Sequence, residues 1–269
     1  MEIKDFKNHK YGWRACGNGN ETIVFLHGMP GSRAAWDPQL KALGESYRCI
    51  SWDMPGYGDS PLNNHAADYT AILDSLEEFI SETAGDSSVH LVGLSLGGMI
   101  ALHAAVQRPY MLRSLVVLDT SPCFGFGGDS DPDQFLSDVR AMVSSNDNVG
   151  DLSKRLIPSL VAPSCSKQVI DEAQAAMSYA TLDGIEFSAR LIAIHDVRKD
   201  LERISTPLLA MAGAEDNETP PSYAKHIAQS VVRGSCIIVP DSGHLANLEN
   251  HEFVTAHIQE FFVDSAKVS

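Results

Sequence analysis

The sequence lacks the features that mark membrane-spanning proteins and disulfide-stabilised secreted proteins. It contains no uninterrupted run of about 18 apolar residues, so we expect no membrane span. Its opening residues, Met1–Phe6, carry no apolar signal-peptide core. The five cysteines are scattered and odd in number, and none belongs to a C-x-x-C pair, which argues against a disulfide framework and a zinc site. We therefore expect a cytoplasmic protein that holds no metal and has no membrane partner.

Basic residues are also scarce. The chain has 20 lysines and arginines against 35 aspartates and glutamates, which gives a formal net charge of −15. This balance argues against binding to nucleic acids or to anionic membrane surfaces. A chain of 269 residues, 44% of them hydrophobic, is long enough for one domain with a large core. The sequence does not indicate the oligomeric state and leaves a homo-oligomer open.

Short apolar runs rich in β-branched residues alternate with helical patterns along the chain. Near-continuous apolar strands in such an alternation are typical of a parallel sheet covered by helices on both faces. The opening residues, through about Ala15, are expected to add one or two antiparallel edge strands. The other expected strands are 23–26, 49–52, 89–92, 115–118, 208–212 and 236–239, and the expected helices around them are 69–83, 99–105, 222–231 and about 252–263.

One region interrupts this alternation. Residues 122–204 contain no convincing strand. Their helical patterns cover 133–143, 149–160, 167–180 and 185–194. An insertion beyond the carboxyl ends of the strands of an open α/β sheet would lie over the crevice where ligands bind. We therefore divide the chain into a core of residues 1–121 and 205–269 and a helical cap of residues 122–204.

The segment Gly93–Gly97 matches the pattern G-x-S-x-G, with strand character before it and a helical pattern after it. This context predicts a nucleophile elbow, a sharp strand-to-helix turn that exposes a serine hydroxyl. Side chains two residues before and after the serine would collide across the turn, so glycine is needed at both positions. Ser95 is therefore the candidate nucleophile.

A serine hydroxyl needs a base within hydrogen-bond reach and a third group that orients the base. After a nucleophile elbow, the acid and then the histidine are expected to follow along the chain. His244 lies directly after the last predicted strand and is our candidate base, with His195 second among the ten histidines. Asp216 follows the last strand but one and is our candidate acid, and Asp119, after an earlier strand, is the alternative.

The negative oxygen that forms during acyl transfer needs two hydrogen-bond donors. One is expected to be the backbone N–H of Leu96, the residue after the nucleophile. The other should come from the loop at 27–32, which follows the first predicted parallel strand. Pro30 has no N–H, so Met29 is the expected donor, and we expect the ring of His27 to organise this loop.

These motifs together resemble those of the α/β-hydrolase superfamily, in the family's order and over essentially the whole chain except residues 122–204. The matching segments are His27–Ser32, Asp53–Gly58, Gly93–Gly98, Gly213–Asp216 and Gly243-His244. The resemblance implies an eight-stranded, mostly parallel sheet with helices on both faces. It also implies a helical cap after the sixth strand and catalysis without a cofactor.

Within the superfamily, further segments are similar to the 3-oxoadipate enol-lactonases and their esterase relatives. They are 36–40, 93–101, 216–221 and 244–249. Those lactonases hold the substrate carboxylate with tryptophan and arginine in the cap, whereas all three tryptophans of this chain lie outside residues 122–204. Arg140, Arg155 and Arg190 lie within that range, but no motif assigns them to a pocket. The substrate-binding residues therefore stay open.

The sequence thus predicts a serine hydrolase that cleaves a small-molecule carboxylic ester or lactone through an acyl-enzyme on Ser95. An alternative with the same three residues is hydrolysis of a C–C bond in a diketone acid of the meta-cleavage type. A ligand-binding or scaffold protein without catalysis is a third hypothesis. The complete set of Ser95, Asp216 and His244 argues against that third hypothesis.

Overall fold

The computed structural model describes residues 1–63, 66–85, 87–146 and 148–267, and the remaining positions of the predicted core and cap lie outside the described residues. The strands are β1 (Lys4–Lys7), β2 (Gly12–Cys16), β3 (Thr22–Leu26), β4 (Arg48–Trp52), β5 (Val89–Leu94), β6 (Leu112–Leu118), β7 (Leu208–Gly213) and β8 (Gly234–Val239). The α-helices are α1 (Asp37–Leu43), α2 (Tyr69–Ala84), α3 (Leu96–Gln107), α4 (Pro132–Ser144), α5 (Val149–Leu160), α6 (Lys167–Met177), α7 (Leu182–Ala193), α8 (Pro221–Ser230), α9 (Ala246–Glu249) and α10 (His251–Ala266).

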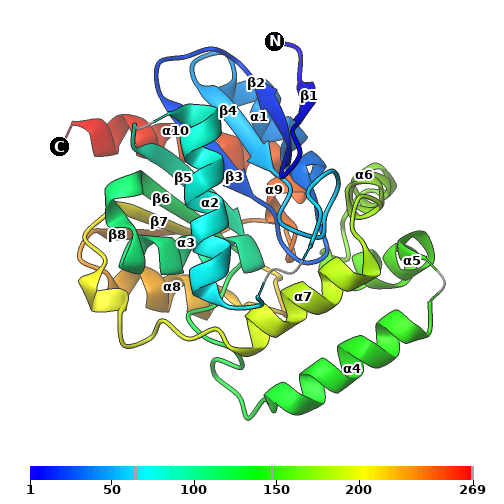
Figure 1. The fold of residues 1–269 in the computed structure, drawn as a ribbon. Helices are drawn as coiled ribbons and strands as arrows, with labels where there is room; N and C mark the ends of the chain where they lie inside the picture. The colour runs from blue at the N-terminus through cyan, green and yellow to red at the C-terminus, as the bar shows by residue number, and fades with distance from the viewer. Residues whose placement is uncertain (64–65, 86, 147, 268–269) are drawn as a thin grey trace.

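The predicted α/β fold with an eight-stranded, mostly parallel sheet is confirmed (Figure 1). The strand order is β1-β2-β4-β3-β5-β6-β7-β8, and β1 and β2 supply the expected antiparallel edge. The order reverses at β3, which pairs in parallel with β4 on one side and with β5 on the other. The loops after β3 and β5 therefore start side by side at the carboxyl edge, where open α/β sheets bind ligands.

Helices cover both faces of the sheet (Figure 1). Successive residues of a strand point to opposite faces. In β3, Val24 and Leu26 join the apolar cluster that contains α2, α3 and α8. Ile23 and Phe25 join the cluster that contains α1 and α10. A strand buried on both faces needs a continuous apolar sequence, which is why these strands are legible in the sequence.

The chain between β6 and β7 forms the helices α4–α7, close to the predicted positions. In Figure 1, α7 lies between α4 and the rest of the molecule. The helix predicted at 167–180 ends at Met177, and Tyr179 accepts a hydrogen bond at its carbonyl from the N–H of Gly58. The last helix of the segment begins at Leu182 because the Thr181 hydroxyl accepts a hydrogen bond from the N–H of Gly184 and caps it. None of the described helices combines the length and apolarity needed to cross a bilayer.

Candidate active site

Ser95 stands at the turn between β5 and α3, with φ 52° and ψ −117°, a strained conformation for a residue with a side chain. A Cβ atom at Gly93 would lie 2.3 Å from the carbonyl oxygen of Gly97, which is the collision expected from the sequence. A Cβ atom at Gly97 would lie 2.2 Å from the carbonyl oxygen of Leu26. The second glycine is therefore needed because α3 starts directly against β3.

The structure brings together the three residues selected as nucleophile, base and acid. The Oγ atom of Ser95 lies 3.0 Å from Nε2 of His244, and Nδ1 of His244 lies 2.9 Å from Oδ2 of Asp216. The three residues follow β5, β8 and β7, and all are buried. An ionised carboxylate only accepts hydrogen bonds, so Nδ1 carries the ring proton and Nε2 is left to accept from the serine hydroxyl.

Local hydrogen bonds define the charge state of this group. Burial alone would raise the pKa of Asp216, but hydrogen bonds from His244 and Thr219 outweigh it and lower the pKa. Burial opposes protonation of His244, yet the hydrogen bond and the charge of Asp216 raise its pKa above 6.5. The hydroxyl of Thr219 donates to Oδ2 of Asp216 at 2.7 Å, and its N–H donates to Oδ1 at 3.0 Å. Thr219 was not predicted; the local turn signal is Asp216 itself, whose Oδ1 accepts a hydrogen bond from the N–H of Glu218 two residues on, at 2.8 Å.

The two alternatives considered for acid and base have other partners. Asp119 is fully buried, accepts hydrogen bonds from the N–H groups of Gly213 and Ala246, and does not bond to His244. Burial and the charge of Asp216 raise the pKa of Asp119 to about 8. The side chain of Asp119 therefore ties the end of β7 to the loop after His244.

The second alternative, His195, is bonded away from the serine. Its Nδ1 lies 3.1 Å from Nε2 of His103, and its Nε2 lies 2.8 Å from the carbonyl oxygen of Ser121. Burial lowers the pKa of His195 to about 4, so the ring is neutral at neutral pH. A neutral ring that donates from Nε2 must accept at Nδ1, so His103 donates to it.

The loop that was expected to supply an oxyanion donor is organised by His27. Met29 lines the pocket beside Ser95, and Leu96 begins α3, where the first backbone N–H groups have no partner inside the helix. Nδ1 of His27 donates to the carbonyl of Gly28 at 2.8 Å, and Nε2 accepts from a backbone N–H. That carbonyl belongs to the peptide whose N–H is that of Met29, so the ring fixes the direction of this N–H.

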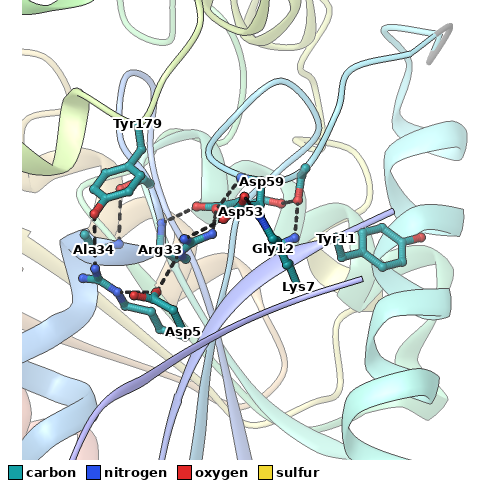
Figure 2. Close-up of polar contacts among 12 residues, drawn as sticks. Asp5, Lys7, Tyr11, Gly12, Arg33, Ala34, Asp53, Asp59 and Tyr179 are labelled. Atoms are coloured by element: carbon teal, nitrogen blue, oxygen red, sulfur yellow. Dashed lines mark hydrogen bonds and ion pairs between the residues drawn. The ribbon is translucent and has the colours of Figure 1, made fainter. Parts of the chain in front are cut away.

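An ion-pair cluster around Arg33 lies directly after this loop (Figure 2). The guanidinium of Arg33 bonds to the fully buried Asp53 at 2.6 Å and also to Asp59 and Asp5, at 2.9 and 3.0 Å. The backbone N–H of Arg33 donates to the same Asp53 carboxylate at 2.8 Å. The ring of Tyr179, from the segment between α6 and α7, covers the guanidinium at 5.5 Å. This cluster joins the loops after β3 and β4 to the inserted segment.

A pocket of about 420 Å³, open to solvent, leads to Ser95. It is lined by Gly28, Met29, Pro30, Gly31, Ala35, Leu94, Ser95, Ile157, Leu160, Ala173, Ala176, His244, Leu245, Asn247 and Leu248. The inserted helices α5 and α6 supply four apolar members of this wall, and no aspartate, glutamate, lysine or arginine of the described residues belongs to it. Arg140, Arg155 and Arg190 do not line it; Arg140 and Arg190 border a shallow depression between α4 and α7.

Comparison with known proteins agrees with this fold. A model of the Alpha/beta hydrolase family matches residues 23–256. The chain is 27% identical to RutD of Stutzerimonas stutzeri, a candidate carbamate hydrolase, over 86% of this chain and 87% of that protein. It is 26% identical to a pimeloyl-[acyl-carrier protein] methyl ester esterase of Vibrio campbellii, over 93% of this chain and 97% of that protein. The structure of a thermophilic esterase from Thermogutta terrifontis superimposes with a TM-score of 0.85 and 24% identity, over 98% of this chain and 99% of that chain, which shows a shared fold.

Proposed function

The chain belongs to the alpha/beta hydrolase family, and on that premise we propose that it cleaves a small, uncharged carboxylic ester or lactone through an acyl-enzyme on Ser95. One observation carries the proposal. The serine hydroxyl at the strained turn is 3.0 Å from a histidine nitrogen whose other nitrogen is 2.9 Å from the carboxylate of Asp216. This is the arrangement that general-base activation of a serine requires.

In the proposed reaction, Oγ of Ser95 attacks the carbonyl carbon of the ester while Nε2 of His244 takes the hydroxyl proton. The carbonyl oxygen becomes negative and accepts hydrogen bonds from the N–H groups of Met29 and Leu96. The intermediate then collapses, the C–O bond to the alcohol breaks, and His244 returns the proton to the leaving oxygen. Water attacks the acyl-enzyme in the same manner and releases the carboxylic acid and the free serine.

The pocket wall supports the choice of an uncharged substrate. Burying a charged group against apolar residues without a partner is strongly unfavourable, and the pocket wall holds no charged side chain among the described residues. The same reasoning argues against the C–C hydrolase alternative, because the carboxylate of a diketone acid would find no cation in this wall.

Residues 122–204 are proposed to act as the cap that selects the substrate. Ile157 and Leu160 from α5, and Ala173 and Ala176 from α6, form one side of the pocket above the serine. These side chains contribute apolar surface and no reacting group. The cap would therefore set the size and shape of the acyl or alcohol group while the loops of the core perform the chemistry.

Replacing the nucleophile tests the proposal. Ser95→Ala is expected to lower kcat/KM for a p-nitrophenyl butyrate substrate by about 10⁴-fold or more, because the covalent step is lost. Ser114, a fully buried serine that bonds to His90 away from the pocket, gives the control Ser114→Ala, which should keep wild-type turnover. A Ser95→Ala variant with turnover close to that of the wild type would contradict the proposed mechanism. A panel that includes an ester with a free carboxylate should show slower turnover of the charged substrate.

A further inference from the structure

Glu249, in the short helix α9, holds the loop of the candidate base from two sides. One of its carboxylate oxygens, Oε1, accepts hydrogen bonds from the backbone N–H groups of Gly243 and Leu245, at 2.9 and 3.2 Å. These are the residues immediately before and after His244. The two peptide groups that flank the histidine are therefore bound to a single oxygen atom, which restricts the backbone from which the imidazole projects.

The other oxygen of the same carboxylate faces the inserted segment. Oε2 of Glu249 accepts a hydrogen bond at 2.7 Å from the N–H of Ala162, which lies between α5 and α6. The N–H of His244 itself donates to the carbonyl of Leu160 at 2.7 Å. A Cβ atom at Gly243 would lie 2.7 Å from both the nitrogen of Ala162 and the carbonyl oxygen of Leu160, so the two backbones are in direct contact.

The carboxylate form is the one that fits these contacts. Burial raises the pKa of Glu249, and the hydrogen bonds from Ala162, Gly243 and Leu245 act in the opposite direction. All three partners are backbone donors, so both oxygens must act as acceptors. An ionised carboxylate can do this, whereas an amide has one acceptor oxygen and one donor group.

We propose that Glu249 is a positioning residue that couples the docking of the inserted helices to the alignment of His244. The proposal rests on the proposed function, because His244 matters here as the base of that reaction. In the docked arrangement, residues 160–162 complete the hydrogen bonds of the histidine loop and place Leu160 in the pocket wall. Displacement of these residues would remove both an acceptor from the His244 backbone and a wall from the substrate pocket.

Two substitutions of Glu249 separate its contact with the inserted segment from its contacts with the histidine loop. In Glu249→Gln, the amide oxygen is expected to replace Oε1, because that orientation preserves two hydrogen bonds and sacrifices one. The amide nitrogen then faces the N–H of Ala162, so the link to the inserted segment is broken while the histidine loop stays held. In Glu249→Ala both links are lost.

The experiment measures two rates on the folded protein well below its melting temperature. The first is the rate constant for modification of Ser95 by a small fluorophosphonate, which needs an aligned His244 but little of the pocket wall. The second is the turnover of p-nitrophenyl butyrate, which reports KM and kcat. Glu249→Ala is expected to lower the modification rate and kcat on the order of tenfold or more, since small misplacements of a reacting group are costly. Glu249→Gln is expected to keep the modification rate within about threefold and to raise KM about fivefold, because the wall formed by α5 and α6 loosens.

A matched control comes from Glu78, whose carboxylate bonds to Lys10 and to Tyr11 on the core. Glu78→Ala and Glu78→Gln should leave the modification rate and KM unchanged. If both Glu249 variants lower only the melting temperature, the residue is merely structural and the coupling is wrong. If Glu249→Ala does not fold, Glu249→Gln decides, and an unchanged KM overturns the proposal. A wild-type protein that does not react with the fluorophosphonate would instead contradict the proposed function itself.

Discussion

The loops at the carboxyl edge of the sheet and the inserted helices α4–α7 are built in different ways. In the loops, backbone groups fix each position: Gly97 lies against the carbonyl of Leu26, and Asp119 binds the N–H groups of Gly213 and Ala246. In the inserted segment, amphipathic helices pack mainly through apolar side chains; α4 buries two residues and α7 buries seven. Backbone contacts demand particular residue types, whereas apolar packing accepts many. The residues that perform the chemistry can therefore be recognised from sequence motifs, whereas the residues of the pocket wall cannot.

The two regions share one apolar cluster and are also joined by polar contacts. The hydroxyl of Tyr57, in the loop after β4, bonds to the hydroxyl of Ser188 in α7 at 2.8 Å. The hydroxyl of Thr181 donates to the carbonyl of Gly56 in the same loop at 2.8 Å. With the contacts of Glu249, these bonds attach the inserted segment to the loops that carry the site.

The largest expected effect lies in the loops. Asp216→Asn is expected to reduce kcat by about 10⁴-fold, because an amide can donate to Nδ1 and favour the wrong histidine tautomer. The base must be neutral, so kcat/KM should fall as the pH drops through the pKa of His244, which Asp216 raises above 6.5. In the variant this acidic limb should move to lower pH. A pH profile with the limb unmoved would show that Asp216 does not act on the histidine.

The second prediction compares the loss of stability when one glycine from each region is replaced by alanine. Gly97→Ala should lower the free energy of unfolding by about 4 kcal/mol or more, because its Cβ would collide with backbone. Gly128, in the segment that leads into α4, has open space around its Cβ position, and Gly128→Ala should change stability by less than about 0.5 kcal/mol. Chemical denaturation of both variants makes the comparison, and equal stabilities would contradict the backbone account of the turn.

The smallest expected effects are losses of stability when either partner of the contact between Arg33 and Tyr179 is replaced. Arg33→Met leaves the carboxylate of Asp53, which has no exposed side-chain surface, without its cation, and should cost about 3 kcal/mol. Tyr179→Ala removes only the ring above the guanidinium, at the edge of the inserted segment, and should cost about 0.5 to 1 kcal/mol. Urea unfolding measures both. A Tyr179→Ala variant as unstable as Arg33→Met would mean that the inserted segment, rather than the core, holds this cluster.

Much of the fold could be predicted because its signals are local. The strands β3–β8 are mostly apolar in their buried parts, which include the polar residues Ser51, His90 and Ser114, and each was predicted to within three residues at either end. Ser95, Asp216 and His244 could be selected because each follows a predicted strand in a recognisable turn. The helix α1 was not predicted, since its seven residues are too few to establish a helical period.

What could not be predicted depends on contacts between distant residues. Glu249 is close in sequence to His244, but its partner Ala162 is 87 residues away, and no local pattern links them. The pocket wall is similarly hidden: Ile157 and Ala173 occupy ordinary apolar positions of amphipathic helices. Only the packing of α5 and α6 around the pocket distinguishes them from residues that face a neighbouring helix.

The covalent intermediate on Ser95 is the most direct test of the proposed mechanism. Wild-type protein mixed with p-nitrophenyl butyrate and quenched in acid within the first turnover should carry one butyryl group on the peptide that contains Ser95. Mass spectrometry of the digested protein locates the group, and the Ser95→Ala variant should carry none. Turnover without an acyl group on Ser95, or an acyl group on another residue that the Ser95→Ala variant retains, would contradict the mechanism.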